Sequence, residues 1–209
     1  MDDLVKTKEV IFDAFVEMTS TIGYENVTMR NIAMQAGINA ATVYHHFDTK
    51  ASMLEYAYNY YDQYQFMNRN SLERMKELVE TASAEEITTG FMYNHVSENQ
   101  KHYIRMILIT KIIYMRLFQD PLANAMFSKI NNNNIRHVSD TLQHGKEIGR
   151  IDPDFDILTF ADVLIGAMHI MGIEAFADVS YEVQQLDKEV NILLMISRIL
   201  NSAFISDAR

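Results

Sequence analysis

The stretch over residues 28–50 constrains the fold more strongly than any other part of the chain. It begins with Thr28, whose hydroxyl is placed to cap a short helix. Gly37 follows where that helix must end, because glycine adopts the left-handed backbone conformation of a sharp turn without steric cost. Asn39 is then placed to cap a second short helix over residues 40–47. Two short helices joined by a glycine-containing turn predict a helix-turn-helix motif.

The same stretch resembles, residue by residue, the DNA-binding signature of the tetracycline-repressor (TetR) family of bacterial regulators. The resemblance joins several spaced positions, which makes the match specific, and it covers roughly the first quarter of the chain. The family usually has an aromatic residue where this chain has Thr19. The positions that carry the resemblance are Ile11-Phe12-Asp13-Ala14, Gly23-Tyr24, Thr28, Val43-Tyr44-His45-His46-Phe47, Lys50 and Leu54.

The resemblance implies an all-α protein with an N-terminal three-helix helix-turn-helix domain and a six-helix C-terminal ligand-binding and dimerisation domain. We place the two domains at residues 1–49 and 50–209. In function, the resemblance implies a ligand-responsive transcriptional regulator, by the family's habit a repressor. Such a protein binds a pseudo-palindromic operator in double-stranded DNA as a homodimer, and a small-molecule effector releases it.

Polar side chains dominate the face that is expected to contact DNA. Tyr44 lies on the exposed side of the second helix, where its hydroxyl can reach a phosphate or a base edge. Asn39 has the two groups that read adenine bidentately. By resemblance, Arg30 reads a base, His46 contacts the DNA backbone and Lys50 binds a phosphate. The full set of expected DNA-contacting residues is Thr28, Arg30, Asn39, Ala40, Ala41, Thr42, Tyr44, His45, His46 and Lys50.

The charge of the chain argues against strong non-specific binding to DNA. The net charge is −10, and residues 1–55 hold four lysines and arginines against eight aspartates and glutamates. Few phosphates can therefore be neutralised, and we expect DNA affinity to depend only weakly on salt concentration. The acidic balance also leaves a different function open, that of a helical ligand-binding or scaffold protein with weak or lost DNA binding.

The rest of the chain has the pattern of a series of helices with recognisable ends. A long helix is expected over residues 49–79, which contain no proline or glycine. Ser83-Ala84-Glu85-Glu86 has the spacing of a capping box, and Asp120-Pro121 ends one helix and starts the next. An almost wholly apolar helix is expected over residues 154–178, buried on two sides.

The last two helices carry more apolar surface than one small domain can cover. In the final helix, Leu193 and Leu200 belong to an apolar stripe with steps of three and four residues. Two such helices from each of two chains would form a four-helix dimer interface, as in the family. We therefore expect a homodimer, with charges at these two leucines producing monomers.

The C-terminal domain is rich in methionine and aromatic residues, which suits a largely apolar or aromatic effector held by few polar groups. We expect the effector to lie between the long fourth helix and the helices that follow residue 100. Its binding would tilt the fourth helix and change the spacing of the two DNA-binding domains. The expected ligand-binding residues are Tyr64, Met67, Phe91, Met106, Phe127 and His169.

Other classes of function lack their sequence signals. The chain has no cysteine, no phosphate-binding or dinucleotide-binding glycine loop, no nucleophile elbow and no His-Glu-x-x-His motif, so we expect neither an enzyme nor a cofactor. No apolar run is expected to reach membrane-spanning length, and Met1-Asp2-Asp3 is acidic where a signal peptide is basic, which indicates a cytoplasmic protein. His137, Asp140 and His144 share one helical face, which leaves a metal-responsive regulator as a further alternative.

Overall fold

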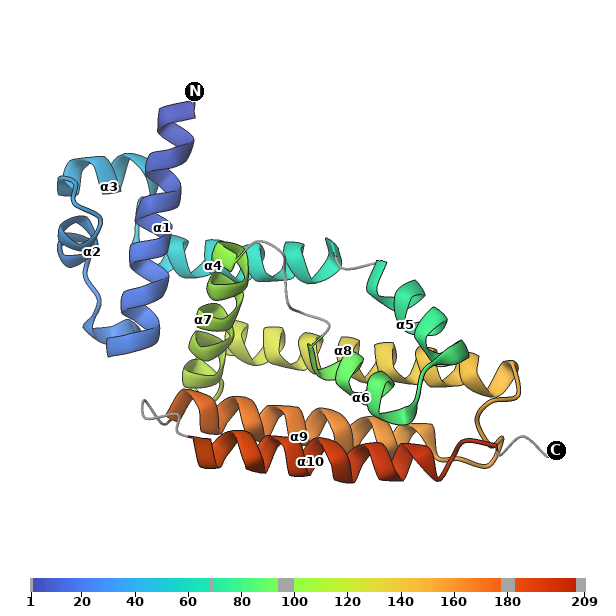
Figure 1. The fold of residues 1–209 in the computed structure, drawn as a ribbon. Coiled ribbons are helices and arrows are strands. Elements are labelled where there is room, and N and C mark those ends of the chain that lie inside the picture. The colour runs from blue at the N-terminus through green and yellow to red at the C-terminus, as the bar shows by residue number, and fades with distance from the viewer. Residues whose placement is uncertain (1, 68–69, 94–99, 178–182, 206–209) are drawn as a thin grey trace. The chain divides into compact units, whose positions relative to one another are not determined.

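The computed structural model describes the backbone of residues 2–67, 70–93, 100–177 and 183–205, and the side chains of 4–64, 72–91, 101–174 and 190–205. Within these ranges the regular structure is helical, apart from one isolated bridge between Ile151 and Phe204 (Figure 1). The all-α prediction is therefore confirmed. The elements are α1 Asp2–Ile22, the 3-10 helix η1 Tyr24–Asn26, α2 Met29–Gln35, α3 Ala40–His46, α4 Lys50–Met67, α5 Asn70–Thr81, α6 Ala84–Tyr93, α7 Gln100–Arg116, α8 Pro121–Glu147, α9 Ile157–Ala177 and α10 Val183–Asn201.

Helix ends follow the capping residues closely. Gly23, Gly37 and Gly149 have positive φ angles of 82°, 69° and 74°, and they follow the ends of α1, α2 and α8. The reciprocal bonds expected of the Ser83 capping box are present, with the Ser83 amide 2.8 Å from Glu86 Oε2 and the Glu86 amide 3.2 Å from Ser83 Oγ. Side-chain caps and left-handed glycines thus set the limits of these helices.

Two predicted helices have different limits in the structure. The run expected over residues 49–79 is described as α4 and α5, so seven helices follow α3 among the described residues, where six were expected. The apolar helix expected from residue 154 begins at Ile157, because Asp156 provides its cap by accepting bonds from the amide and hydroxyl of Thr159.

The chain divides into two compact units, which we describe separately. The first unit comprises Met1–Phe66 and Ser97–Phe127, and the second comprises Met67–Val96 and Ser128–Arg209. The first unit therefore holds α1 to α3 together with most of α4 and all of α7. The domain limits at residues 1–49 and 50–209 concern function and stay a prediction.

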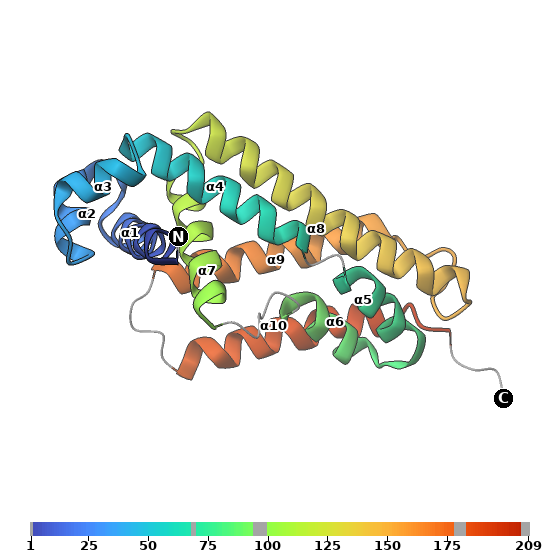
Figure 2. The ribbon, with the colours of Figure 1, turned by 90° about the horizontal axis from the view of Figure 1, so that it is seen from above.

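The core of the first unit is centred on α1. Ile11, Phe12 and Phe15 are fully or almost fully buried, and α1 packs against α2 and α7. The ring of Phe12 meets Tyr56 of α4 edge to face, with ring centroids 4.9 Å apart. This packing places the helix-turn-helix beside α1 (Figure 2).

Thr19 places a hydroxyl inside this core. Its side chain is 1% exposed, and its Oγ1 is the one buried polar side-chain atom of the described residues without a hydrogen-bond partner. An unsatisfied buried hydroxyl costs about 1–3 kcal/mol of desolvation. The chain has this small polar residue where the TetR signature usually has an aromatic one.

Thr19→Val is therefore expected to stabilise the protein by about 1 kcal/mol, because it removes the unsatisfied hydroxyl and keeps the shape of the side chain. Chemical denaturation followed by circular dichroism measures the change. Thr21→Val is the matched control, since the exposed Thr21 hydroxyl already donates to the Glu17 carbonyl at 2.8 Å. A Thr19→Val protein that is less stable than the wild type would show that the hydroxyl has a partner.

The core of the second unit joins α5, α6, α8, α9 and α10, with α6 packed on α10 and α9 beside α10 (Figures 1 and 2). Leu142, Leu164, Ile196 and Leu200 are 0% exposed in it. The assignment of Leu200 to a dimer interface was therefore wrong. On α10, the Leu200 side chain points into the core of its own chain, so a charge at this position would disrupt folding.

The helix α9 is less covered than predicted. Phe160, Leu164 and Ile165 are buried, but Leu158 and Ile170 are 64% and 58% exposed, so one side of α9 faces away from the core. The expectation that no apolar run is long enough to cross a membrane was also wrong. By length and composition alone, 157–174 meets that condition, and 33% of this window is buried.

His169 lies partly buried on α9, with its Nε2 2.9 Å from Asn131 Oδ1. Burial lowers the pKa of His169 from its ordinary value of 6.5. As the pH falls below that value, the unfolded chain takes up the proton first, so the free energy of unfolding decreases. We expect the urea concentration at the unfolding midpoint to decrease as the pH is lowered from about 7 to about 5. The His169→Gln variant should show a weaker dependence of this midpoint on pH. Equal slopes for the two proteins would contradict this assignment.

Candidate nucleic-acid interface

The helix-turn-helix is built on two side-chain caps. The Thr28 amide lies 2.7 Å from Asn31 Oδ1, and the Asn31 amide lies 3.2 Å from Thr28 Oγ1, which closes a reciprocal box at the start of α2. Gly37 then turns the chain, and Asn39 caps α3. Val43 is fully buried on the inner face of α3, so the opposite face is presented outward.

Asn39 uses its acceptor within the protein. Its Oδ1 accepts from the Thr42 amide at 2.8 Å and from the Thr42 hydroxyl at 3.0 Å. Bidentate recognition of adenine requires the amide oxygen as well as the amide nitrogen. Base reading by Asn39 therefore requires that these cap bonds be shared or broken, and it stays a prediction.

The outward face of α3 has the side chains expected of a DNA-contacting surface. Tyr44 is 52% exposed, and Ala41 and His45 are exposed beside it, while Arg30 is exposed on α2. His46 is partly exposed, and its ring lies edge to face with that of His45, with centroids 5.4 Å apart. This face can offer hydroxyl, imidazole and guanidinium groups to a nucleic acid.

The electrostatic setting keeps His46 uncharged near neutral pH. Burial, His45 and Lys8 all lower the pKa of His46 from its ordinary value. The Lys8 ammonium lies over the ring of Tyr56 at 4.3 Å and near that of Phe47 at 5.3 Å. These cation–π contacts explain how a lysine of α1 comes to lie beside the second helix of the motif.

Lys50 has a structural role that the sequence did not show. Its Nζ donates to the carbonyls of Tyr24 and Val27 at 2.7 and 2.8 Å, and it lies 4.1 Å from the Tyr24 ring centroid. The ammonium thus anchors the segment between α1 and α2 to the start of α4. One of its three donors is left for the predicted phosphate contact, which remains a prediction.

Comparison with known proteins identifies this part of the chain. Residues 11–57 match the model of the bacterial regulatory proteins of the TetR family. The chain carries a TetR-family DNA-binding domain. The matched residues span most of α1, η1, α2, α3 and the first part of α4.

Other known proteins are similar to longer stretches of this chain. The chain is 26% identical over 103 residues to the biofilm operon icaADBC HTH-type negative transcriptional regulator IcaR of Staphylococcus aureus, covering 47% of this chain and 50% of the relative. The match thus spans about half the length of that curated relative. A putative TetR-family regulator from Mesorhizobium loti has the same fold, with a TM-score of 0.67, 17% identity, and 97% and 98% of the two chains covered. The structure of the SmeT–triclosan complex also has this fold, with a TM-score of 0.65 and 16% sequence identity. That match covers 97% of this chain and 93% of the SmeT chain.

The residues predicted to bind an effector divide between the two units. In the first unit, the Tyr64 ring lies on His102, with centroids 4.1 Å apart, and Phe127 contacts Tyr114. Met106 is partly buried there, whereas Phe91 and His169 belong to the second unit. The side chain of Met67 lies outside the described residues. The effector site remains a prediction.

The histidines proposed as metal ligands have other contacts. His144 Nε2 lies 3.0 Å from Glu80 Oε1, and the His137 ring meets that of Phe91 edge to face. Asp140 is exposed. In the part of the chain that the structure describes, no three His, Asp or Glu side chains are grouped to hold a metal ion.

Proposed function

We propose that this TetR-family protein is a transcriptional repressor rather than an enzyme. It binds a pseudo-palindromic operator in double-stranded DNA as a homodimer, and a largely apolar small molecule releases it. The observation that carries the proposal is the TetR-type motif over residues 11–57 together with the exposed outer face of α3. The similarity to IcaR, a negative transcriptional regulator, supports repression.

Exposed apolar side chains support the homodimer. Val163, Ile170 and Ile173 follow one another on α9 in steps of seven and three residues, and all three are exposed. A Cβ at Gly166, between the first two, would meet no atom within 4 Å. Met195 and Ile199 are exposed on α10. In a cytoplasmic homodimer, a second copy of the chain would cover this exposed apolar face of α9.

An apolar effector is supported by composition and by one similar protein. SmeT has been solved in complex with triclosan. In the second unit, His169 and Asn131 form a partly buried polar pair, with the imidazole Nε2 2.9 Å from the amide oxygen. Release requires that the effector bind the state with low DNA affinity more tightly than the state with high DNA affinity. A difference of roughly 1–3 kcal/mol between these two affinities would weaken DNA binding several-fold to hundredfold.

A gel shift with the DNA that flanks the protein's own gene tests the function. We expect a discrete complex that competitor DNA of unrelated sequence does not remove. A protein that binds no such fragment but still binds small molecules would instead support the helical ligand-binding or scaffold alternative.

Tyr44→Phe is the variant that tests the proposed contact face. It removes an exposed hydroxyl without disturbing the core, so we expect operator affinity to fall roughly tenfold, about 1.5 kcal/mol, if the hydroxyl bonds a phosphate. Thr81→Val, which removes an exposed hydroxyl from the other unit, is the control. Lys50→Ala is less informative, because it also releases the Tyr24 and Val27 carbonyls. Unchanged affinity of Tyr44→Phe would place the DNA contacts elsewhere.

A further inference from the structure

Helix α7 belongs to the first unit and packs along α1. Arg105, Ile109, Ile112 and Arg116 follow each other in steps of four, three and four residues, so they share one face of α7. The two isoleucines are 0% exposed. An arginine stands at each end of this apolar stripe, and the two are separated by about three helical turns.

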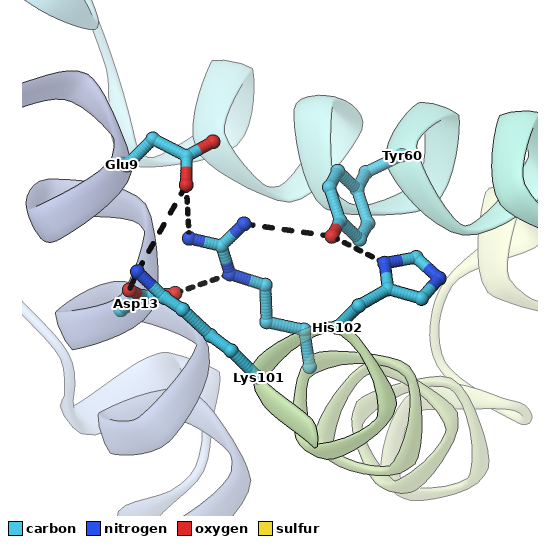
Figure 3. Close-up of polar contacts among 6 residues, drawn as sticks. Glu9, Asp13, Tyr60, Lys101 and His102 are labelled. Carbon is cyan, nitrogen blue, oxygen red and sulfur yellow. Dashed lines mark hydrogen bonds and ion pairs between the residues drawn. The ribbon is translucent and has the colours of Figure 1, made fainter. Parts of the chain in front are cut away.

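The first arginine ties α7 to α1 and to α4. Arg105 is 6% exposed, its Nη2 donates to Glu9 at 2.7 Å, and its Nε donates to Asp13. Its Nη1 lies 3.5 Å from the hydroxyl of Tyr60. Lys101 adds a bond to Asp13 at 2.8 Å. Figure 3 shows the two carboxylates on α1 directed toward α7, with Tyr60 approaching from α4.

These contacts fix the charges of the cluster. Burial disfavours both ions, but the hydrogen bonds outweigh it, lowering the pKa of Asp13 and raising the pKa of Arg105. Beyond Tyr60, the hydroxyl lies 2.8 Å from His102 Nδ1. Burial and the nearby Arg105 lower the pKa of His102, so the ring is neutral near pH 7 and can accept a hydrogen bond from the Tyr60 hydroxyl.

The second arginine holds the other end of α1. The Arg116 guanidinium lies 4.2 Å from the ring centroid of Tyr24 in η1, and its Nη1 donates to Glu25 at 3.2 Å. Its Nε donates to Asp120 at 3.1 Å, and Asp120 also lies 3.3 Å from the hydroxyl of Tyr58 on α4. Arg116 therefore connects the exit of α1 to α4 and to the start of α8.

We propose that Arg105 and Arg116 are positioning residues for DNA binding. Each guanidinium has a planar set of donors that fixes direction, whereas the buried isoleucines between them make only non-directional apolar contacts. Together they set α1 and η1 at one place against α7 and α4. Because α1 packs on α2, this position is passed to the helix-turn-helix. The inference rests on the proposed function, since it concerns operator binding.

The alternative is that the ion pairs serve only to stabilise the fold. A variant with Glu9→Gln, Asp13→Asn and Arg105→Met separates the two roles. It leaves no carboxylate opposite a missing guanidinium, and neutral replacement of a buried ion cluster is often harmless to stability. We expect its melting temperature to stay close to that of the wild type while its affinity for the wild-type operator fragment falls at least tenfold.

Two further variants complete the experiment. Arg105→Lys keeps the positive charge but loses the planar set of guanidinium donors. We therefore expect a folded protein whose affinity for the operator fragment lies between those of the wild type and the neutral variant. Lys101→Met removes the exposed member of the cluster and should leave affinity within about twofold, because exposed ion pairs contribute little. The probe in each case is the fragment that the wild-type protein shifts.

The outcomes are distinct. A wild-type protein that binds no fragment contradicts the proposed function. If the neutral variant binds the fragment as tightly as the wild type, the positioning role is contradicted and the proposed function is not. If the neutral variant does not fold, the same conclusion follows from an Arg105→Lys variant that binds as tightly as the wild type. A loss of affinity in the neutral variant with an unchanged melting temperature supports it.

Discussion

A protein carrying Ile170→Glu and Met195→Glu is expected to be monomeric in solution and to lose operator binding. The two side chains are 58% and 55% exposed on α9 and α10, so the substitutions leave the core of the second unit intact and place charges on the proposed dimer face. A monomer binds one half-site at a time. Without the second DNA-binding domain in the same molecule, affinity should fall by about 10²–10⁴-fold.

Sedimentation velocity and anisotropy titration measure the two effects on one sample. The control carries Asn132→Glu and Gln143→Glu, which add the same charge at exposed polar positions of α8. Circular dichroism should show unchanged helix content for both proteins. A double variant of α9 and α10 that still sediments as a dimer would place the interface on another surface.

Leu200→Ala is expected to lower the free energy of unfolding by about 2–5 kcal/mol, the cost of a cavity in a packed core. Leu200 is fully buried, whereas its neighbour Ile199 is 41% exposed, so Ile199→Ala is a matched control for the same helix turn. The control should change stability by under about 1 kcal/mol at protein concentrations where the wild type is monomeric. Equal losses in urea denaturation would contradict the assignment of Leu200 to the core.

The local features of the DNA-binding domain could be predicted because single residues determine them. Thr28, Gly37 and Asn39 each act on the backbone within three residues of themselves, and the structure has the cap or turn that each predicted. The Ser83 capping box and the start of α8 at Pro121 follow the same logic. Such local signals do not depend on what the rest of the chain does.

Long-range partners could not be predicted in the same way. The sequence shows Lys50 beside a DNA-binding motif, but its carbonyl partners lie more than twenty residues away in the chain. Leu200 fits an apolar stripe, yet helical spacing alone does not say whether a stripe faces the core or a partner. For Arg105 and Arg116 the sequence does contain one indication of a shared role, because their spacing places both on the same face of an apolar helix.

The most direct test of the account is selection of DNA by the wild-type protein from a random double-stranded pool, followed by anisotropy titration of the enriched sequence. The account predicts a pseudo-palindrome bound by two protomers, with a shallow salt dependence because residues 1–55 hold four cationic side chains and Lys50 is engaged within the protein. Tyr44→Phe should bind the selected sequence roughly tenfold more weakly. Failure to enrich any sequence at low salt would contradict the claim that this domain binds DNA.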